Sequence, residues 1–240
     1  MHTTEIIRKE IQAFTKSRSL VIEILGIFAL IGIAPILLLY LTSTKPEFSI
    51  LTMSYLMGTL QSMPAMLAAS CGAILTADIF AGEMEKKTLE TLLVSPVKEN
   101  EIYLGKITAV FIPLLILGEF VFALSTLMVY YLMNTHGFQG VDLQVWYFSG
   151  AIMTPLSLML SILVTAIVST RIRSAREASL ALFIPILPLV AMSIGSVYLN
   201  LEITISTWIM LGLIIGIADI TLYMLGASLY KRQKIIVNLH

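Results

Sequence analysis

Six long apolar runs constrain this chain more than any other feature of its sequence. A helix needs about 20 apolar residues to cross roughly 30 Å of hydrocarbon, and six runs reach that length. They are Leu20–Leu41, Met53–Phe80, Ile107–Met133, Val145–Thr170, Ala178–Leu199 and Trp208–Tyr230. Open strands in a bilayer would leave backbone groups unpaired, so each run is predicted to be a helix. The third helix is expected to begin earlier than its apolar run, over residues 102–133. We therefore expect an all-α integral membrane protein with six transmembrane helices.

The composition agrees with a location in the bilayer. Hydrophobic residues make up 58% of the chain and charged residues only 12%, whereas charged residues make up about a quarter of a typical soluble domain. The single cysteine, Cys71, excludes an intrachain disulfide, and no metal site is predicted. The net charge is zero, and no nucleic-acid partner is expected. No repeat or linker divides the chain, so residues 1–240 are predicted to form one domain.

The basic residues predict the orientation of the six runs. If the runs cross the membrane alternately, fourteen of the fifteen Lys and Arg residues fall on one side and Lys45 falls on the other. The fourteen are Arg8, Lys9, Lys16, Arg18, Lys86, Lys87, Lys98, Lys106, Arg171, Arg173, Arg176, Lys231, Arg232 and Lys234. Basic residues are enriched on the cytoplasmic side of membrane proteins. Both termini are therefore expected to be cytoplasmic, in a multi-pass protein of the cell membrane.

The segment before the first run has an amphipathic pattern. Ile7, Ile11 and Phe14 recur at helical spacing within residues 4–18, among charged residues. This pattern is typical of a helix that lies in the membrane interface. We expect such an interfacial helix to lead into the first span.

One cytoplasmic connection, residues 81–101, is longer than a helix hairpin requires. Within it, Gly82–Val94 is predicted to be a short helix that Ser95 and Pro96 end. Glu83 and Glu85 favour the N-terminal end of its dipole. Its apolar residues give it a face that could pack on a membrane or on a partner protein.

The same region resembles the signature of ABC-2 type transporter permeases, in which an acidic helix after the second span precedes a Gly-Lys pair that enters the third. The residues that carry the resemblance are Asp78, Gly82, Glu83, Glu85, Thr88, Leu89, Glu90, Leu92, Leu93, Ser95, Pro96, Val97, Gly105 and Lys106. The length, the topology and the interfacial helix also match that family. One departure is Lys87, because the family often has Gly immediately before the Thr.

The resemblance implies a permease that is driven by a separate ATPase subunit. In that family the short helix is a coupling helix, which docks on the ATPase and transmits its nucleotide-driven closure. The residues that would dock are Gly82, Glu83, Glu85, Thr88, Leu89, Glu90, Leu92, Leu93 and Pro96. The family architecture implies two permease copies, as a homodimer, with two ATPases. ATP and Mg would be bound by the partner subunit, and no cofactor is expected in this chain.

The chain itself contains no phosphate-binding loop of the G-x-x-x-x-G-K-[ST] type. The only Gly-Lys pair, Gly105 and Lys106, is followed by Ile107, and Asn100 stands where the first Gly would be needed. The chain is therefore not expected to be an enzyme, and ATP hydrolysis is assigned to the partner.

Three acidic residues inside the spans are candidate substrate or cation residues. Glu119 lies near the centre of the third span and Asp219 at the centre of the sixth, while Glu23 is near the cytoplasmic end of the first. A carboxyl at the bilayer centre costs at least about 2.5–3.5 kcal/mol on insertion scales. No Lys, Arg or His lies at the same depth in the sequence. Either these acids bind a transported cation or cationic drug, or they are neutral and stabilise helix contacts.

The predicted function is that of an ATP-driven exporter permease for a drug, an ion, a lipid or a similar substrate. Two alternatives use Glu119 and Asp219 instead of a docked ATPase. One is an ion-coupled secondary carrier, and the other is an intramembrane enzyme.

Overall fold

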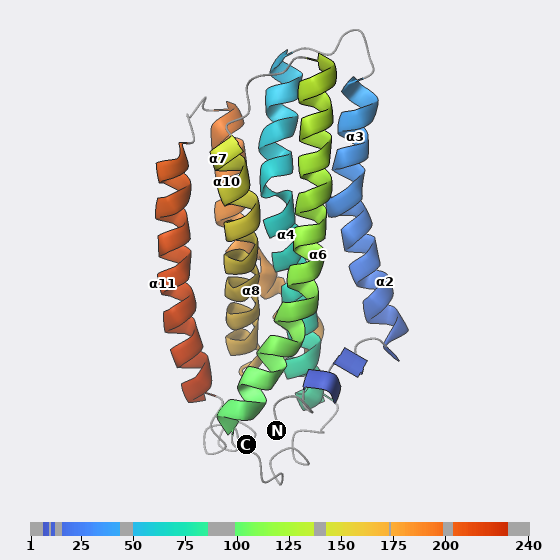
Figure 1. Cartoon of the computed structure of the whole chain (residues 1–240). Helices are drawn as coiled ribbons and strands as arrows, with labels where there is room; N and C mark the ends of the chain where they lie inside the picture. Colours follow the sequence, from blue (N-terminus) through green and yellow to red (C-terminus); the bar gives the residue numbers. More distant parts are fainter. Residues whose placement is uncertain are drawn as a thin grey trace.

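The computed structural model describes residues 7–9, 11–12, 16–43, 50–85, 99–136, 143–172, 174–198 and 204–229. These residues form helices and contain no strand, which confirms the all-α prediction (Figure 1). The elements are α2 (Arg18–Ile27), η1 (Phe28–Ile33), α3 (Ala34–Ser43), α4 (Ile50–Glu85), α6 (Glu99–His136), α7 (Leu143–Tyr147), η2 (Phe148–Ile152), α8 (Met153–Ser169), α9 (Ala175–Ser179), η3 (Leu180–Leu182), α10 (Phe183–Tyr198) and α11 (Ile205–Leu229).

Within the part of the chain that the structure describes, five helices are long and apolar enough to cross a membrane. They cover Arg18–Leu38, Leu60–Gly82, Asn100–Thr135, Leu143–Ser169 and Ile205–Leu229, so the chain is a multi-pass membrane protein. The predicted span Ala178–Leu199 corresponds to η3 and α10. Helix α10 has 16 residues, or about 24 Å at 1.5 Å per residue, which is shorter than the hydrocarbon core. The count of six spans therefore stays a prediction.

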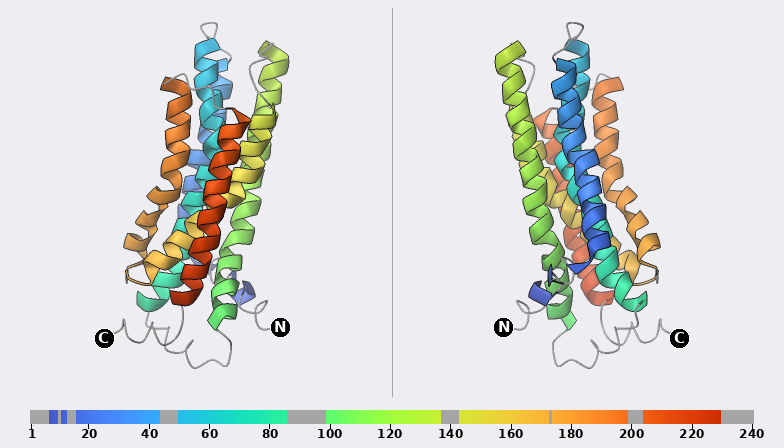
Figure 2. Two further views of the ribbon diagram at one scale, coloured as in Figure 1. Left: turned by 90° about the vertical axis from the view of Figure 1, so that its left-hand side faces the viewer. Right: turned by 90° about the vertical axis from the view of Figure 1, so that its right-hand side faces the viewer.

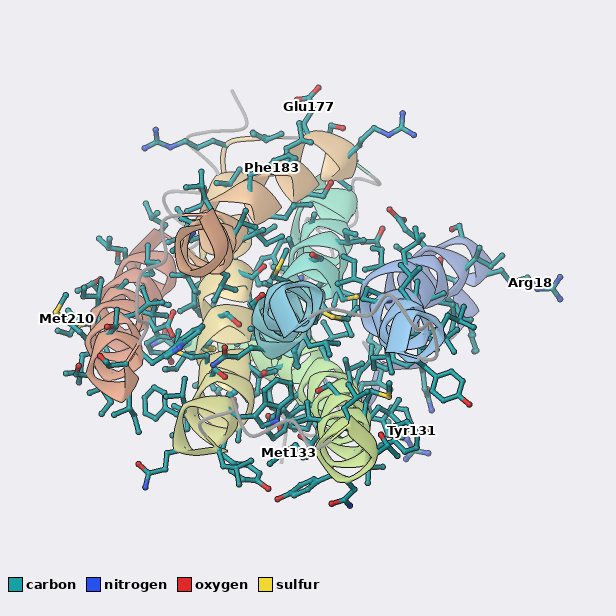
Figure 3. The ribbon with its side chains drawn as sticks, turned by 90° about the horizontal axis from the view of Figure 1, so that it is seen from above. Arg18, Tyr131, Met133, Glu177, Phe183 and Met210 are labelled. Carbon is teal, nitrogen blue, oxygen red and sulfur yellow. The ribbon has the colours of Figure 1, made fainter. Side chains whose placement is uncertain are left out.

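Helix α4 is the centre of the bundle. Seen from above, it is surrounded by α3, α6, α8 and α10, while α11 lies outside α8 (Figure 3). In the span of α4, 78% of the residues are buried, compared with 22% in α11. Many buried residues of α4 are small, among them Ala65, Ala69, Cys71 and Ala73. Small side chains let several helices approach one backbone closely, which suits this sequence to a central position.

The closest partner of α4 is α8, and polar side chains join the two helices. The Ser157 hydroxyl donates a hydrogen bond to the Ala65 carbonyl oxygen at 3.3 Å, and the Ser161 hydroxyl donates one to the Ala69 carbonyl oxygen. A Cβ at Gly72 would lie 2.8 Å from Leu158 Cδ1, so the backbones approach more closely than a larger residue would allow. These contacts fix the register between the second and fourth predicted spans.

Two widened, π-helical turns border the centre of α6. Gly32 in η1 faces Val121 of α6, and a Cβ there would lie 3.2 Å from Val121 Cγ2. On the other side, Gly150 in η2 lies so close to Phe122 that a Cβ would overlap its ring. Pi-helical turns are rare and frequently occur at functional sites. Here they bring glycine backbones against α6 at neighbouring positions.

Aromatic side chains join α6 to α7 at the end of the bundle where α7 begins. The Trp146 indole N–H donates to the Thr126 hydroxyl at 3.0 Å, and the hydroxyls of Tyr130 and Tyr147 are 3.0 Å apart. Phe122 stacks on Trp146 with ring centroids 6.4 Å apart. Tyrosine and tryptophan favour the membrane–water interface, so this cluster is suited to a boundary of the bilayer.

The peripheral helices expose long apolar faces. Helices α2 and α3 lie at one side of the bundle and α11 at the other, and Figure 2 shows both sides. The exposed residues of α11 include Met210, which points away from the bundle in Figure 3, and Leu213, Ile217, Ile220 and Met224. Gly212 faces α8, because a Cβ added there would lie 3.5 Å from Met153 Sδ. A Cβ added at Gly216 would meet nothing within 4 Å. Such faces fit lipid or a second membrane chain.

The Lys and Arg residues that the structure describes lie at one end of the bundle, which we call the basic end. They are Arg8, Lys9, Lys16, Arg18, Lys106, Arg171 and Arg176. The first described residues and the end of α11 lie at this same end (Figure 1). This distribution supports the predicted orientation with a cytoplasmic basic end, which stays a prediction.

Candidate functional site

The predicted docking segment connects α4 to α6 at the basic end. Gly82, Glu83 and Glu85 form the last turn of α4, which continues without a break from the predicted second span. The other predicted docking residues, Thr88, Leu89, Glu90, Leu92, Leu93 and Pro96, lie outside the described residues. The structure therefore places the two helices that carry the segment, α4 on its N-terminal side and α6 on its C-terminal side.

Lys106, in the first turns of α6, is a buried cation beside the end of α4. Its side chain is 0% exposed. The ammonium group donates a hydrogen bond to the Ile79 carbonyl oxygen at 3.4 Å and lies 5.1 Å from the centroid of the Phe80 ring. A desolvated ammonium is costly unless such groups compensate it. The two helices that flank the docking segment are thus joined by a charge-assisted contact.

Tyr103 lies one turn before Lys106 and extends this contact to α11. Its ring meets Phe80 edge-on, with centroids 6.0 Å apart, and meets Tyr223 of α11 at the same centroid distance. A Cβ at Gly226 would overlap the Tyr103 hydroxyl, so the absence of a side chain at this position makes room for the ring. The consecutive helices α4 and α6 therefore meet the distant helix α11 at Tyr103.

Asp219 is a buried carboxyl in the middle of α11. It is 8% exposed, and neither carboxylate oxygen has a hydrogen-bond partner among the described residues. Its neighbours on the same side of the helix, Ile215 and Leu222, belong to an apolar cluster that also contains Leu160 and Val164 of α8. The carboxyl therefore lies in an apolar environment between α11 and α8, where a bound cation or a proton would neutralise it.

Glu119 and Glu23 lie in different environments. Glu119, on α6, is partly exposed and follows Gly118, where a Cβ would lie 2.7 Å from Thr154 Cγ2 of α8. Within the described part of the chain it makes no ion pair. Glu23 is exposed on α2, near the basic end. Each of these acids thus lies on a helix of the bundle, as the predicted spans require.

The structure does not bring Glu119 and Asp219 to one site within a single chain. Helix α8 lies between α6 and α11 (Figure 3), and the two acids are on the helices at its opposite sides. In the described residues there is no group of three or more His, Cys, Asp or Glu side chains that could hold a metal ion. Among the described residues, Glu119 and Asp219 therefore do not form a pair of acids within one subunit.

Sequence reasoning missed the contact between Lys106, Tyr103 and α11. The Gly-Lys pair forms part of the family signature, yet nothing in its spacing indicates which groups of α4 the ammonium contacts. Gly226 does not indicate this contact in the sequence, because a single glycine near a helix end has many explanations. The stripe of Thr154, Ser157 and Ser161 on α8 could have been found from its helical spacing.

Comparison with protein families gives one match that covers most of the chain. Residues 4–206 match the model of a family described as ABC-2 family transporter protein. A search of curated proteins finds none that matches. The match includes the signature region at residues 78–106, which confirms the family prediction. On this evidence the chain belongs to the ABC-2 family of transporter membrane proteins.

Proposed function

We propose that the chain is the permease subunit of an ATP-binding cassette exporter. It moves a substrate, such as a drug, an ion or a lipid, out of the cytoplasm when a separate ATPase subunit drives it. The observation that carries this proposal is the family match over residues 4–206, which includes the acidic signature and the Gly-Lys pair. The multi-pass bundle supports a pathway through a membrane, in our proposal the cell membrane.

The proposed partner is an ATPase that binds ATP and Mg and docks at residues 82–96. Two features support this location. The segment connects the basic ends of α4 and α6, and Lys106 joins those two helices beside it. A force applied between α4 and α6 therefore reaches the centre of the bundle through α4, which most other helices contact.

A second copy of the chain is proposed to complete the pathway. Helices α2, α3 and α11 leave apolar faces exposed on opposite sides of one subunit. Glu119 and Asp219 are separated by α8 within one subunit, so a substrate path that uses both acids would need a second subunit or a rearrangement. A homodimer is the simplest assembly that supplies the second subunit.

Co-purification with an ATPase tests the proposal directly. The tagged chain is expressed with a candidate ATPase subunit, purified, and reconstituted in nanodiscs for ATP hydrolysis assays. We expect a stable complex that Glu90→Arg disrupts, because the substitution reverses a charge in the docking segment. The matched control is Glu177→Arg at the same end of the bundle. Glu177 is exposed on α9 and points away from the bundle (Figure 3).

Two outcomes would contradict the proposal. In one, the ATPase fails to bind the unmodified chain. In the other, Glu90→Arg and Glu177→Arg behave alike. Transport by the permease alone, without any ATPase, would favour the ion-coupled carrier. The observation that favours this second candidate is the buried Asp219 carboxyl, whose two oxygens have no partner in the described residues.

A further inference from the structure

We propose that Tyr103 transmits the movement of the docking segment to α11, and that Lys106 is a positioning residue that holds α6 against α4 for this purpose. The inference rests on the proposed function, because it assumes that an ATPase moves residues 82–96. It adds a defined route from that segment to the helix that carries Asp219.

The first step of the route is the junction of α4 and α6. Lys106 is fully buried, and two groups that it contacts, the Ile79 carbonyl and the Phe80 ring, belong to the last two turns of α4. Moving α6 away from α4 would leave the ammonium desolvated without these groups, which is unfavourable. The ends of α4 and α6 are therefore expected to move together when the segment between them is displaced.

The second step is the contact from α6 to α11. Tyr103 is 2% exposed, and the centroid of its ring lies 6.0 Å from that of Phe80 and 6.0 Å from that of Tyr223. Its hydroxyl occupies the space that a side chain at residue 226 would need. A rigid ring inserted against a bare backbone transmits displacement better than a flexible side chain, since it has few alternative rotamers.

The third step is the position of this contact on α11. Helix α11 packs chiefly along α8 and is mostly exposed to its surroundings. Tyr103 therefore provides a direct contact between α6 and this peripheral helix. Tyr223 follows Asp219 by four residues, which places both on the same side of α11, one turn apart. A displacement at Tyr103 is therefore delivered close to the buried carboxyl.

The test measures the distance between α6 and α11 in the complete complex. Spin labels are attached to Leu127→Cys on α6 and Leu213→Cys on α11, two exposed positions away from the contact. Cys71 is 0% exposed and is not expected to react. Labelled subunits are diluted with unlabelled ones, and pulsed EPR compares the nucleotide-free complex with the complex trapped by ATP and vanadate.

We expect trapping to shift the α6–α11 distance in the otherwise unmodified complex. Tyr103→Ala should abolish this shift while ATP hydrolysis continues, and Lys106→Met should reduce it. The matched control is Leu104→Ala, on the neighbouring residue of α6, which is 44% exposed and should keep the full shift. If Tyr103→Ala does not fold, Tyr223→Ala removes the other ring of the contact and should give the same loss. A shift that persists without either ring would overturn the inference.

A second measurement uses the permease alone, so that it does not depend on the ATPase. Gly226→Ala should push Tyr103 aside and change the distance between the labels, whereas Gly216→Ala, which meets nothing within 4 Å, should leave it unchanged. Equal distances in both variants would contradict the contact itself. Failure of any ATPase to bind would instead contradict the proposed function, and the two failures can be told apart.

Discussion

At the scale of single residues, glycines decide how closely α6 and α8 approach each other. Gly118→Ala would place a Cβ 2.7 Å from Thr154 Cγ2 and 3.3 Å from Ala68 Cβ. We expect it to lower the free energy of unfolding by about 1–3 kcal/mol, the usual cost of overpacking a core. Reversible unfolding in mixed micelles, followed by helical circular dichroism, measures the change.

The control for this prediction is Gly216→Ala on α11. It adds the same methyl group to a helix of the same bundle, but no atom lies within 4 Å of the new Cβ. The gain in helix propensity should therefore dominate there, and stability should stay the same or rise. Equal losses at both positions would mean that the α6–α8 contact is looser than the structure describes.

A second residue-scale prediction concerns Asp219. Because both carboxylate oxygens are buried without a partner among the described residues, Asp219→Leu should raise the free energy of unfolding by about 1–3 kcal/mol, the cost of an unsatisfied polar group. Glu23→Leu, at an exposed position of α2, should change it little. The measurement is again unfolding in mixed micelles.

The same Asp219 variants separate a functional role from a structural one. If the carboxyl takes part in transport, Asp219→Leu gives a more stable protein that transports less. Asp219→Asn, which keeps the shape and removes the charge, should then also transport less. Undiminished transport in both variants over a range of pH would show that the carboxyl serves no cation. A loss of stability in Asp219→Leu would mean that the carboxyl has a partner in the assembled transporter.

The sequence indicates unusual residues better than it indicates their partners. Glu119 and Asp219 stand out because any ionisable group deep in an apolar run is rare. Tyr103 does not stand out, and Lys106 is marked only as part of the Gly-Lys pair, because their contacts involve Phe80 before the docking segment and Tyr223 near the other end of the chain. Such long-range contacts leave no local pattern, and a buried lysine near a helix start reads like an ordinary interfacial one.

At the scale of elements, the contact between α4 and α8 combines close apolar packing with hydrogen bonds from hydroxyl groups. Lipid is as apolar as a leucine side chain, so packing and hydrogen bonds must hold membrane helices together. Ser157→Ala and Ser161→Ala should each cost about 0.6 kcal/mol, the average for such bonds between membrane helices. Unfolding measurements on each variant and on the pair give the values.

Ser228→Ala is the matched control for that prediction. Among the described residues its hydroxyl donates to the Leu225 carbonyl of its own helix, at 2.8 Å, so its loss should not loosen a contact between the described helices. If Ser228→Ala costs as much as Ser161→Ala, the bonds from α8 to α4 contribute nothing specific to the register of the two helices.

The elements themselves differ in how far sequence predicts them. Long apolar helices such as α8 and α11 can be predicted, because a span in lipid must form all of its backbone hydrogen bonds within itself. The π-helical turns η1 and η2 could not be predicted from local pattern, and each contains a glycine, Gly32 or Gly150, that lies close to a side chain of α6. The continuation of α4 to Glu85 was also not expected, since Gly82 suggested a boundary where the structure has an unbroken helix.

At the scale of the whole molecule, the central position of α4 is the feature that sequence suggests least directly. Its run of alanines and other small residues permits contact on every side, but it does not specify which helices will use those sides. The order of helices around α4 follows from paired details, such as Ser161 with the Ala69 carbonyl and Gly118 with Thr154. Such pairs can be identified only from the structure, because their members are far apart in the sequence.

The last prediction concerns the number of spans, because α10 is the short helix on which it depends. If α10 crosses the membrane, Ser206 at the start of α11 lies outside with Thr135 at the end of α6, while Glu177 lies inside. Single cysteines at these three exposed positions should then differ in their reaction with a membrane-impermeant maleimide on intact cells. Ser206→Cys and Thr135→Cys should react at once, and Glu177→Cys only after permeabilisation. Cys71 is buried and supplies the unreactive background. A five-span chain would place Ser206 on the same side as Glu177. Ser206→Cys would then react, like Glu177→Cys, only after permeabilisation.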